Sequence, residues 1–284
     1  MLNLILAICC SAAITLFMKL SESRRKSSAG MIIFNYAVCS ALGAIYLPGI
    51  SLAQNADGLY LTFGLGALTG ILYLVVFLLL QVNITRNGVI LGSVFMRLGI
   101  IIPVLISIIF FKEIPDALQI AGIIMAIAAI IVFNIDKNEI STSGTDAAAG
   151  SILLLIALFL GSGISESMIN IYDNVGVPDL NNLFLEAIFF FALVCSVILY
   201  FVRKEKMGKW DIIFGLLIGV PNYYTSRFFL AALKDVPAVV AYPVYSVSTL
   251  LIISILGVIC FKEHLTKRKI VGLVMVIAAV AMLQ

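Results

Sequence analysis

The residues best suited to chemistry lie in a long apolar segment whose central stretch, residues 161–173, reads GSGISESMINIYD. The polar members of this stretch are Ser162, Glu166, Asn170 and Asp173. Their spacing of four, four and three residues places them on one face of a helix. A carboxylate on a membrane helix costs about 2.5–3.5 kcal/mol on insertion scales. We therefore expect this stripe to face protein or a water-filled cavity, with Glu166 binding substrate or carrying a proton.

Three more charged side chains, those of Arg97, Glu186 and Arg227, also lie inside apolar segments. Arg97 has little polar sequence around it, so we expect a substrate or an opposite charge to neutralise it. Arg227 has two interpretations that the sequence leaves open. It either contacts substrate or forms a structural ion pair with Glu166 or Glu186.

Aromatic residues accompany these charges. The expected substrate-binding set consists of Arg97, Glu166, Asn170, Glu186 and Arg227 together with Tyr73, Tyr223, Tyr224, Tyr242 and Tyr245. Aromatic rings beside a carboxylate suit an organic cation, and an arginine suits a carboxylate or phosphate. Both together favour an amphoteric metabolite such as an amino acid. The remaining tyrosines of interest are interpreted as a belt at the membrane interface: Tyr46, Tyr60, Tyr172 and Tyr200.

The composition assigns this chain to the lipid bilayer. Apolar residues make up 62% and charged residues 12% of the sequence, and the mean hydropathy is +1.16. The small net charge of +3, without a continuous basic face, argues against nucleic acid. Five cysteines without CxxC spacing and the single histidine, His264, predict no metal site, no cofactor and no enzyme activity. No GxxxxGK[ST] motif occurs, so we expect transport to be driven by a gradient.

A membrane helix needs about 20 apolar residues. Ten segments of that kind predict an all-α integral membrane fold: 2–20, 30–50, 58–81, 88–111, 117–135, 150–171, 181–202, 210–233, 237–261 and 268–284. The proline residues inside these segments, Pro103, Pro221 and Pro243, are predicted bends.

The ten segments divide into two equivalent sets of five. At an offset of 150 residues, Phe111-Lys112-Glu113 returns as Phe261-Lys262-Glu263, and Tyr73 matches Tyr223. An odd number of spans in each set means that the second set enters the membrane from the opposite side. We therefore predict two inverted five-helix repeats, residues 1–137 and 148–284, as in many secondary transporters.

Basic residues in the loops predict the orientation. Fourteen Lys and Arg residues fall in the odd-numbered loops, whereas the other side holds only Lys112 and Lys234. The odd-numbered loops are therefore expected in the cytoplasm and both termini outside, in the plasma membrane of a prokaryote.

The repeated Phe-Lys-Glu before a Gly/Ala-rich fifth helix resembles the EamA-type branch of the drug/metabolite transporter superfamily. The end of the first span, Leu16–Glu22, also resembles the first helix of the small multidrug resistance proteins. Those proteins carry a drug- and proton-binding glutamate where this chain has Ser11, so their mechanism does not transfer to span 1. The resemblance implies the ten-helix fold and a transporter.

We accordingly expect a secondary active transporter that moves a small polar or zwitterionic metabolite, such as an amino acid or amine, by alternating access. The expected partners are that substrate, the lipid bilayer and protons as the candidate coupling ion, with Glu166 as the proton carrier. The chain is expected to be a monomer or a homodimer. The alternative is a flippase of a lipid or lipid-linked sugar with the same fold.

Overall fold

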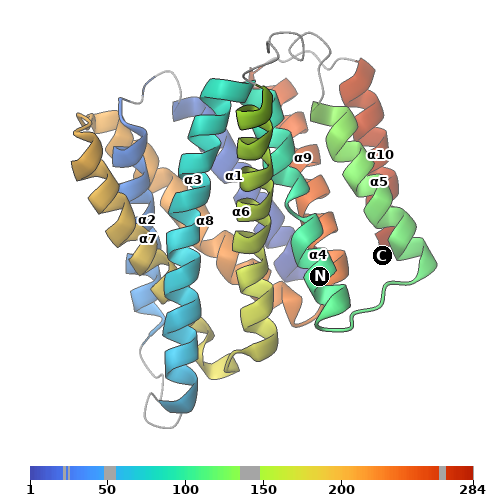
Figure 1. Cartoon of the computed structure of the whole chain (residues 1–284), viewed down its shortest axis with the longest axis horizontal. Helices are drawn as coiled ribbons and strands as arrows, with labels where there is room; N and C mark the ends of the chain where they lie inside the picture. Colours follow the sequence, from blue (N-terminus) through green and yellow to red (C-terminus); the bar gives the residue numbers. More distant parts are fainter. Residues whose placement is uncertain (22–23, 25, 48–55, 135–147, 262–266, 284) are drawn as a thin grey trace. The chain divides into compact units, whose positions relative to one another are not determined.

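The computed structural model of the chain describes residues 1–21, 24, 26–47, 56–134, 148–261 and 267–283. In these residues all regular structure is helical (Figure 1). The ten α-helices are α1 (Leu2–Ser21), α2 (Ser28–Ile45), α3 (Ala56–Leu98), α4 (Ile101–Ile109), α5 (Ala117–Asn134), α6 (Ala148–Val175), α7 (Asn181–Arg203), α8 (Lys209–Leu233), α9 (Ala238–Phe261) and α10 (Lys267–Leu283), with a short 3-10 helix at Pro178–Leu180.

Several of these helices suit a bilayer by length and composition. Within the described residues, six are long and apolar enough to cross a membrane, and three shorter helices are also apolar. The shorter ones are Phe95–Ile109, Ala117–Val132 and Ile270–Leu283. The chain is therefore an all-helical membrane protein with multiple apolar helices.

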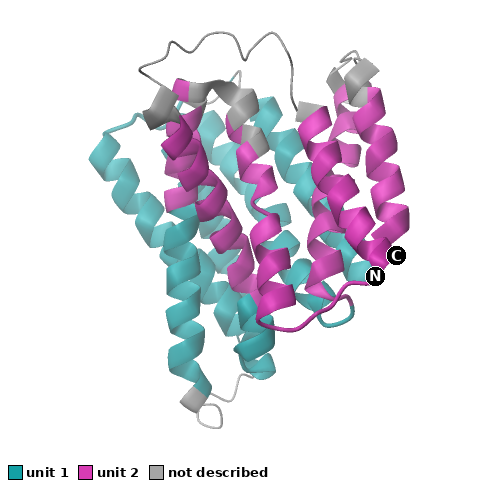
Figure 2. Cartoon of the chain, turned by 45° about the vertical axis from the view of Figure 1, so that its right-hand side comes forward, with its two compact units in different colours: residues 1–74, 171–235 teal, residues 75–170, 236–284 magenta. Residues whose placement is uncertain are grey.

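The helices group into two compact units, coloured separately in Figure 2. Unit 1 contains residues 1–74 and 171–235, and unit 2 contains residues 75–170 and 236–284. Each unit draws helices from both halves of the sequence. The division between the units passes through α3 and through the end of α6.

Glycines set the close helix contacts of unit 1. Gly66 of α3 faces Ala187 of α7, and a Cβ at Gly70 would lie 2.5 Å from the backbone oxygen of Ile188. In the same way Gly215 and Gly219 bring α8 against α2. Because only hydrogen occupies these positions, the backbones approach closely. Both Gly-xxx-Gly pairs, Gly66/Gly70 and Gly215/Gly219, are therefore packing faces.

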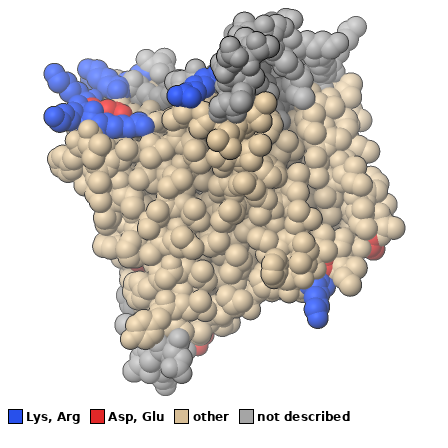
Figure 3. All heavy atoms as spheres, viewed as in Figure 1, with Lys and Arg blue, Asp and Glu red and all other residues tan. Residues whose placement is uncertain are grey.

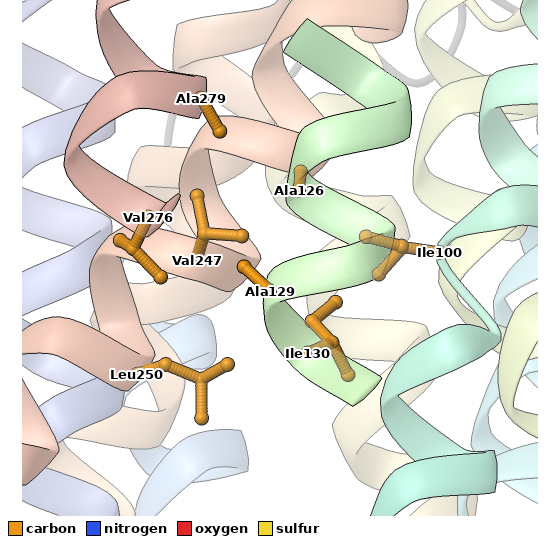
Figure 4. Packing of buried hydrophobic residues seen from close by; sticks show 8 residues of the cluster. All are labelled: Ile100, Ala126, Ala129, Ile130, Val247, Leu250, Val276 and Ala279. Atoms are coloured by element: carbon orange, nitrogen blue, oxygen red, sulfur yellow. The ribbon is translucent and has the colours of Figure 1, made fainter. Parts of the chain in front are cut away.

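Small apolar residues fill the core of unit 2, where α5 packs on α10 and on α9 (Figure 4). The cluster consists of Ile100, Ala126, Ala129, Ile130, Val247, Leu250, Val276 and Ala279. Alanines at the α5–α10 crossing allow the helices to interlock tightly. The outer faces of both helices are apolar and exposed, as lipid-facing scaffold helices require.

Helix α3 reverses its direction inside unit 2, although its backbone stays helical throughout. Three contacts with α6 trace this path: the side chain of Leu79 lies against Gly161, Asn83 Nδ2 donates 2.9 Å to Leu154 O, and Ser162 Oγ donates 3.0 Å to Met96 O. The chain thus moves toward the start of α6 and then back along it. Figure 1 shows the ribbon turning at its upper end. The part of α3 that lies in unit 2 therefore turns back on itself between the predicted spans 58–81 and 88–111.

The helix is interrupted within the predicted span 88–111, in which Pro103 was expected to cause a bend. Helix α3 ends at Leu98 and α4 begins at Ile101. Pro103 has no N–H, and its ring clashes with the carbonyl of the residue four positions earlier, which is Gly99. Gly99 also crosses α6 so closely that a Cβ there would lie 2.9 Å from the nitrogen of Gly163. Sequence alone locates the proline but not the place of the break.

The acidic side chain of Asp211 accepts hydrogen bonds at the starts of two helices, α2 and α8. Asp211, which is fully buried, accepts backbone hydrogen bonds from Lys26 at 2.8 Å, Ser27 at 3.1 Å and Gly208 at 2.8 Å. These bonds join the start of α2 to the start of α8 within unit 1. Figure 3 shows basic side chains gathered at this end, over α2, α7 and α8.

The repeated Phe-Lys-Glu motif has a structural role at its first copy. Lys112 adopts a positive φ of 56°, which lets the chain turn away from α4. Glu113 Oε2 then accepts a hydrogen bond of 2.9 Å from the backbone N–H of Val239, in the first turn of α9. A carboxylate there satisfies a free donor and the positive end of the helix dipole. In the second copy, Lys262 and Glu263 lie outside the described residues.

Candidate functional site

Unit 2 brings together two opposite charges, Arg97 in the last turn of α3 and Glu166 on α6. Both side chains are partly buried, and they lie close enough to interact electrostatically. Among the residues that the structure describes, neither side chain forms a hydrogen bond or a direct ion pair.

The helix break positions Arg97. A cation in the last turn of a helix is stabilised by the partial negative charge of that terminus. Helix α3 ends one residue later, at Leu98. Arg97 therefore belongs to the C-terminal turn of α3, next to the apolar helix α4. Tyr245 of α9 is the other group that interacts electrostatically with Arg97.

The α6 stripe faces protein, as predicted. Ser162 bonds to the backbone of α3, and Asn170 Nδ2 donates a hydrogen bond of 2.7 Å to Ser107 Oγ of α4. The hydroxyl of Tyr242 on α9 donates 2.7 Å to the backbone oxygen of Glu166. Asn170 and Tyr242, both expected to bind substrate, thus hold α6 against α4 and α9. Their bonds fix the position of Glu166 between them.

Unit 1 carries a second polar cluster, centred on Arg227 of α8. Its Nη1 donates to Asn182 Oδ1 at 3.1 Å and to Tyr223 Oη at 3.2 Å. Its guanidinium lies 3.8 Å above the ring centre of Tyr46, a cation–π contact. In the described part of this unit, Arg227 contacts neutral groups and forms no direct ion pair with Glu186. The ion pair with Glu186, one of the two interpretations from sequence, is therefore absent here.

Stacked tyrosines form one wall of this cluster. The rings of Tyr46 and Tyr223 lie 6.0 Å apart and are inclined by only 8°. The hydroxyls of Tyr46 and Tyr224 are 3.3 Å apart, within hydrogen-bonding distance. The stack continues from Tyr223 through Phe189 to Tyr36, beside which Tyr73 lies.

Two tyrosines correct the expected interfacial belt. Tyr46 belongs to the Arg227 cluster, and Tyr172 is only 1% exposed. The ring of Tyr172 stacks on Phe184 at 3.7 Å, and its hydroxyl lies 3.1 Å from that of Thr62. Tyr60, by contrast, is 88% exposed, as a belt residue would be. Position near the end of a span therefore does not distinguish a belt tyrosine from a packed one.

Glu186 of α7 lies beside the same cluster. Its Oε1 accepts a hydrogen bond of 2.5 Å from Ser40 Oγ of α2. Its Oε2 is sealed from solvent and has no hydrogen-bond partner among the described residues. Gly43 of α2 makes room for that oxygen, because a Cβ at this position would overlap it.

The expected site residues thus divide between the units. Unit 1 holds Tyr73, Glu186, Tyr223, Tyr224 and Arg227, and unit 2 holds Arg97, Glu166, Asn170, Tyr242 and Tyr245. The expected set missed Ser40, Gly43, Tyr46 and Asn182. Only Asn182 has a usable signal in the sequence, since it precedes Glu186 by one helical turn.

Comparison with known proteins gives matches of three kinds. Residues 148–284 match the model of the EamA-like transporter family. An uncharacterized protein of Haemophilus influenzae is 22% identical over 291 residues, which cover 98% of this chain and 96% of that protein. A crystal structure superposes with a TM-score of 0.74 over 99% of this chain and 94% of its own, at 13% identity. At that identity the structural match supports the fold alone.

Proposed function

Because its C-terminal half, residues 148–284, belongs to the EamA-like transporter family and so to the drug/metabolite transporter superfamily, we propose that this membrane protein is a gradient-driven carrier. The carrier moves a small polar or zwitterionic metabolite, such as an amino acid or amine, by alternating access. Family members are transporters, which fits the expectation that the chain is not an enzyme.

The observation that carries the substrate class is the pair Arg97 and Glu166 in unit 2. A guanidinium offers a fork of donors to a carboxylate or phosphate, and a carboxylate accepts from an amine. The two side chains interact electrostatically without direct contact in the described residues. An amphoteric solute that binds between them satisfies both charges at once. An uncharged solute leaves two partly buried charges without close partners, which is costly.

Helix contacts support the inverted repeats. Exchanging the halves turns α1 into α6, α2 into α7 and α3 into α8. Under this exchange, the contact between α2 and α8 corresponds to a contact between α7 and α3. The contact between α1 and α8 corresponds to a contact between α6 and α3. Contacts are present for each of these pairs. A transporter with such repeats alternates access by rocking one bundle against another.

The expected location is the plasma membrane of a prokaryote, with both termini outside. The basic end of unit 1 supports the placement of loops 1–2 and 7–8 on the cytoplasmic side. A monomer or a homodimer both suit this proposal, since α5 and α10 present apolar outer faces.

Transport by the reconstituted protein tests the function. Proteoliposomes are loaded with amino acids, amines, nucleosides or sugar phosphates, one compound at a time, and a pH or sodium gradient is applied. We expect gradient-dependent movement of at least one amphoteric compound, and its loss in Arg97→Gln. Movement of a fluorescent lipid with no movement of any soluble compound would contradict the proposal and favour the flippase.

A further inference from the structure

Glu186 has an unusual environment for a carboxyl group inside an apolar helix. One oxygen, Oε1, accepts the hydroxyl of Ser40, and the other, Oε2, is sealed from solvent with no partner among the described residues. A buried ionised carboxylate needs a cation or several donors to offset its lost hydration. A single hydroxyl supplies neither.

The site is built for a carboxyl group. Ser40 and Gly43 lie three residues apart on the same face of α2, and both contact the side chain of Glu186. Ser40 supplies the hydrogen bond, and Gly43 leaves the space that Oε2 fills. Any larger residue at position 43 would displace that oxygen. The contact surface of α2 is therefore shaped around this side chain.

Among the residues that the structure describes, the groups seen to face Glu186 carry no positive charge. From α2 come Ser40 and the thiol of Cys39, and from α8 comes the hydroxyl of Tyr223. From α3 come glycines, which pack on the neighbouring residues of α7. The cation of the cluster, Arg227, is held by Asn182 and Tyr223.

We propose that Glu186 is the proton-binding site of the carrier, a role that rests on the proposed gradient-driven transport. Uptake joins a proton from water to a carboxylate oxygen, and release returns it to water, with no other bond broken. Only a proton fits at Oε2, because that atom has no accessible surface in the described arrangement. A metal ion needs several ligands, and the described residues hold no group of three His, Cys, Asp or Glu side chains.

The sequence predicts both substrate binding and proton carrying for Glu166, and these two roles now fall to different residues. Glu166 interacts electrostatically with the opposite charge of Arg97 in unit 2, and this pair is the basis for assigning substrate binding to it. Glu186 has no such partner while it is protonated. Once Glu186 releases the proton, Arg227 of the same unit is a cation that can approach it. Arg227 is bonded to Asn182, which precedes Glu186 by one turn of α7. Proton release thereby draws Arg227 away from Tyr46 and rearranges the aromatic wall.

Infrared difference spectra of the reconstituted protein, recorded between acidic and alkaline pH, detect this proton without any substrate. Other carboxyl groups of the chain also give carbonyl bands at acidic pH, so the expected signature is one carbonyl band of a protonated carboxylic acid that the wild type and Glu166→Gln share and that Glu186→Gln lacks. The band's survival in Glu186→Gln would overturn the proposal. Ser40→Ala provides a second variant that keeps the carboxyl group. We expect it to shift the pH at which the band disappears, whereas Ser248→Ala, on α9, leaves that pH unchanged.

Transport measurements separate failure of the proton site from failure of the carrier. Glu186→Gln is expected to exchange a transported compound at equal pH but to lose accumulation driven by a pH gradient. Retention of that accumulation would overturn the proton site and leave transport intact. A wild type that shows the infrared band but moves no compound would contradict the proposed function and leave the proton site standing.

Discussion

The hydroxyl of Tyr242 on α9 donates a hydrogen bond of 2.7 Å to the backbone oxygen of Glu166 on α6. This bond anchors the backbone of Glu166, whose side chain interacts electrostatically with Arg97 of α3. Tyr242 is 2% exposed, so the bond is protected from water. The charged pair of unit 2 is thus positioned by a neutral contact from a third helix.

Tyr242→Phe removes this bond and keeps the ring. We expect the free energy of unfolding to fall by about 1 kcal/mol, the net contribution of one hydrogen bond. Binding of a transported compound should weaken as well, because Glu166 loses its support. Thermal unfolding and a binding titration measure both effects. Tyr200→Phe is the matched control, since no hydrogen bond of the Tyr200 hydroxyl is seen in the described residues; equal losses in the two variants would refute the role of Tyr242.

Gly99→Ala tests the crossing of α3, α4 and α6. A Cβ at Gly99 would lie 2.9 Å from the nitrogen of Gly163 and would overlap the side chain of Ser162. Overpacking of this kind costs about 1–3 kcal/mol. Gly64→Ala, inside α3, places its Cβ where nothing lies within 4 Å. It should be neutral or stabilising by about 0.5–1 kcal/mol, because alanine favours helix. Thermal unfolding that gives both variants the same stability would contradict the tight crossing.

Asp211→Ala leaves three backbone donors without their acceptor at the joined starts of α2 and α8. Unsatisfied buried donors cost about 1–3 kcal/mol each, and Asp211 is completely buried. We expect a clear loss of stability in thermal unfolding, with faster hydrogen exchange at Lys26 and Ser27. Asp235→Asn alters an exposed carboxylate and serves as the control. Normal exchange protection of Ser27 in Asp211→Ala would show that another group holds this end of α2.

The sequence predicted most of the fold because helix spans depend on local hydropathy. Helices α6 to α10 each begin and end within a few residues of the predicted segments. The family resemblance is confirmed by the match over residues 148–284. The polar stripe of α6 was also predictable, because its period follows from the residues alone. Helix α2 ends at Ile45, before the predicted limit of 50, since Tyr46 already leaves the helix.

The site was less predictable because side-chain partners depend on tertiary contacts. Nothing in the sequence indicates that Ser40 meets Glu186 or that Tyr46 lies beneath Arg227. The opposite charges suggested that Arg227 and Glu186 pair, yet Arg227 turns to Asn182 and two tyrosines. Tyr223 is one turn away on the same helix, but Asn182 lies on α7 and Tyr46 directly follows α2, so two of the three partners depend on tertiary packing.

The most direct test of the carrier is a thermal-stability scan of the purified protein against amino acids, amines, carboxylic acids, nucleosides and sugar phosphates. A ligand of the folded state stabilises it by about 2.7 kcal/mol at a hundredfold excess over its Kd. We predict that an amphoteric compound stabilises the wild type, Lys234→Gln and Asp235→Asn, but not Arg97→Gln or Glu166→Gln. A compound that stabilises Arg97→Gln and Glu166→Gln as strongly as the wild type would contradict the assignment of the substrate site to this pair.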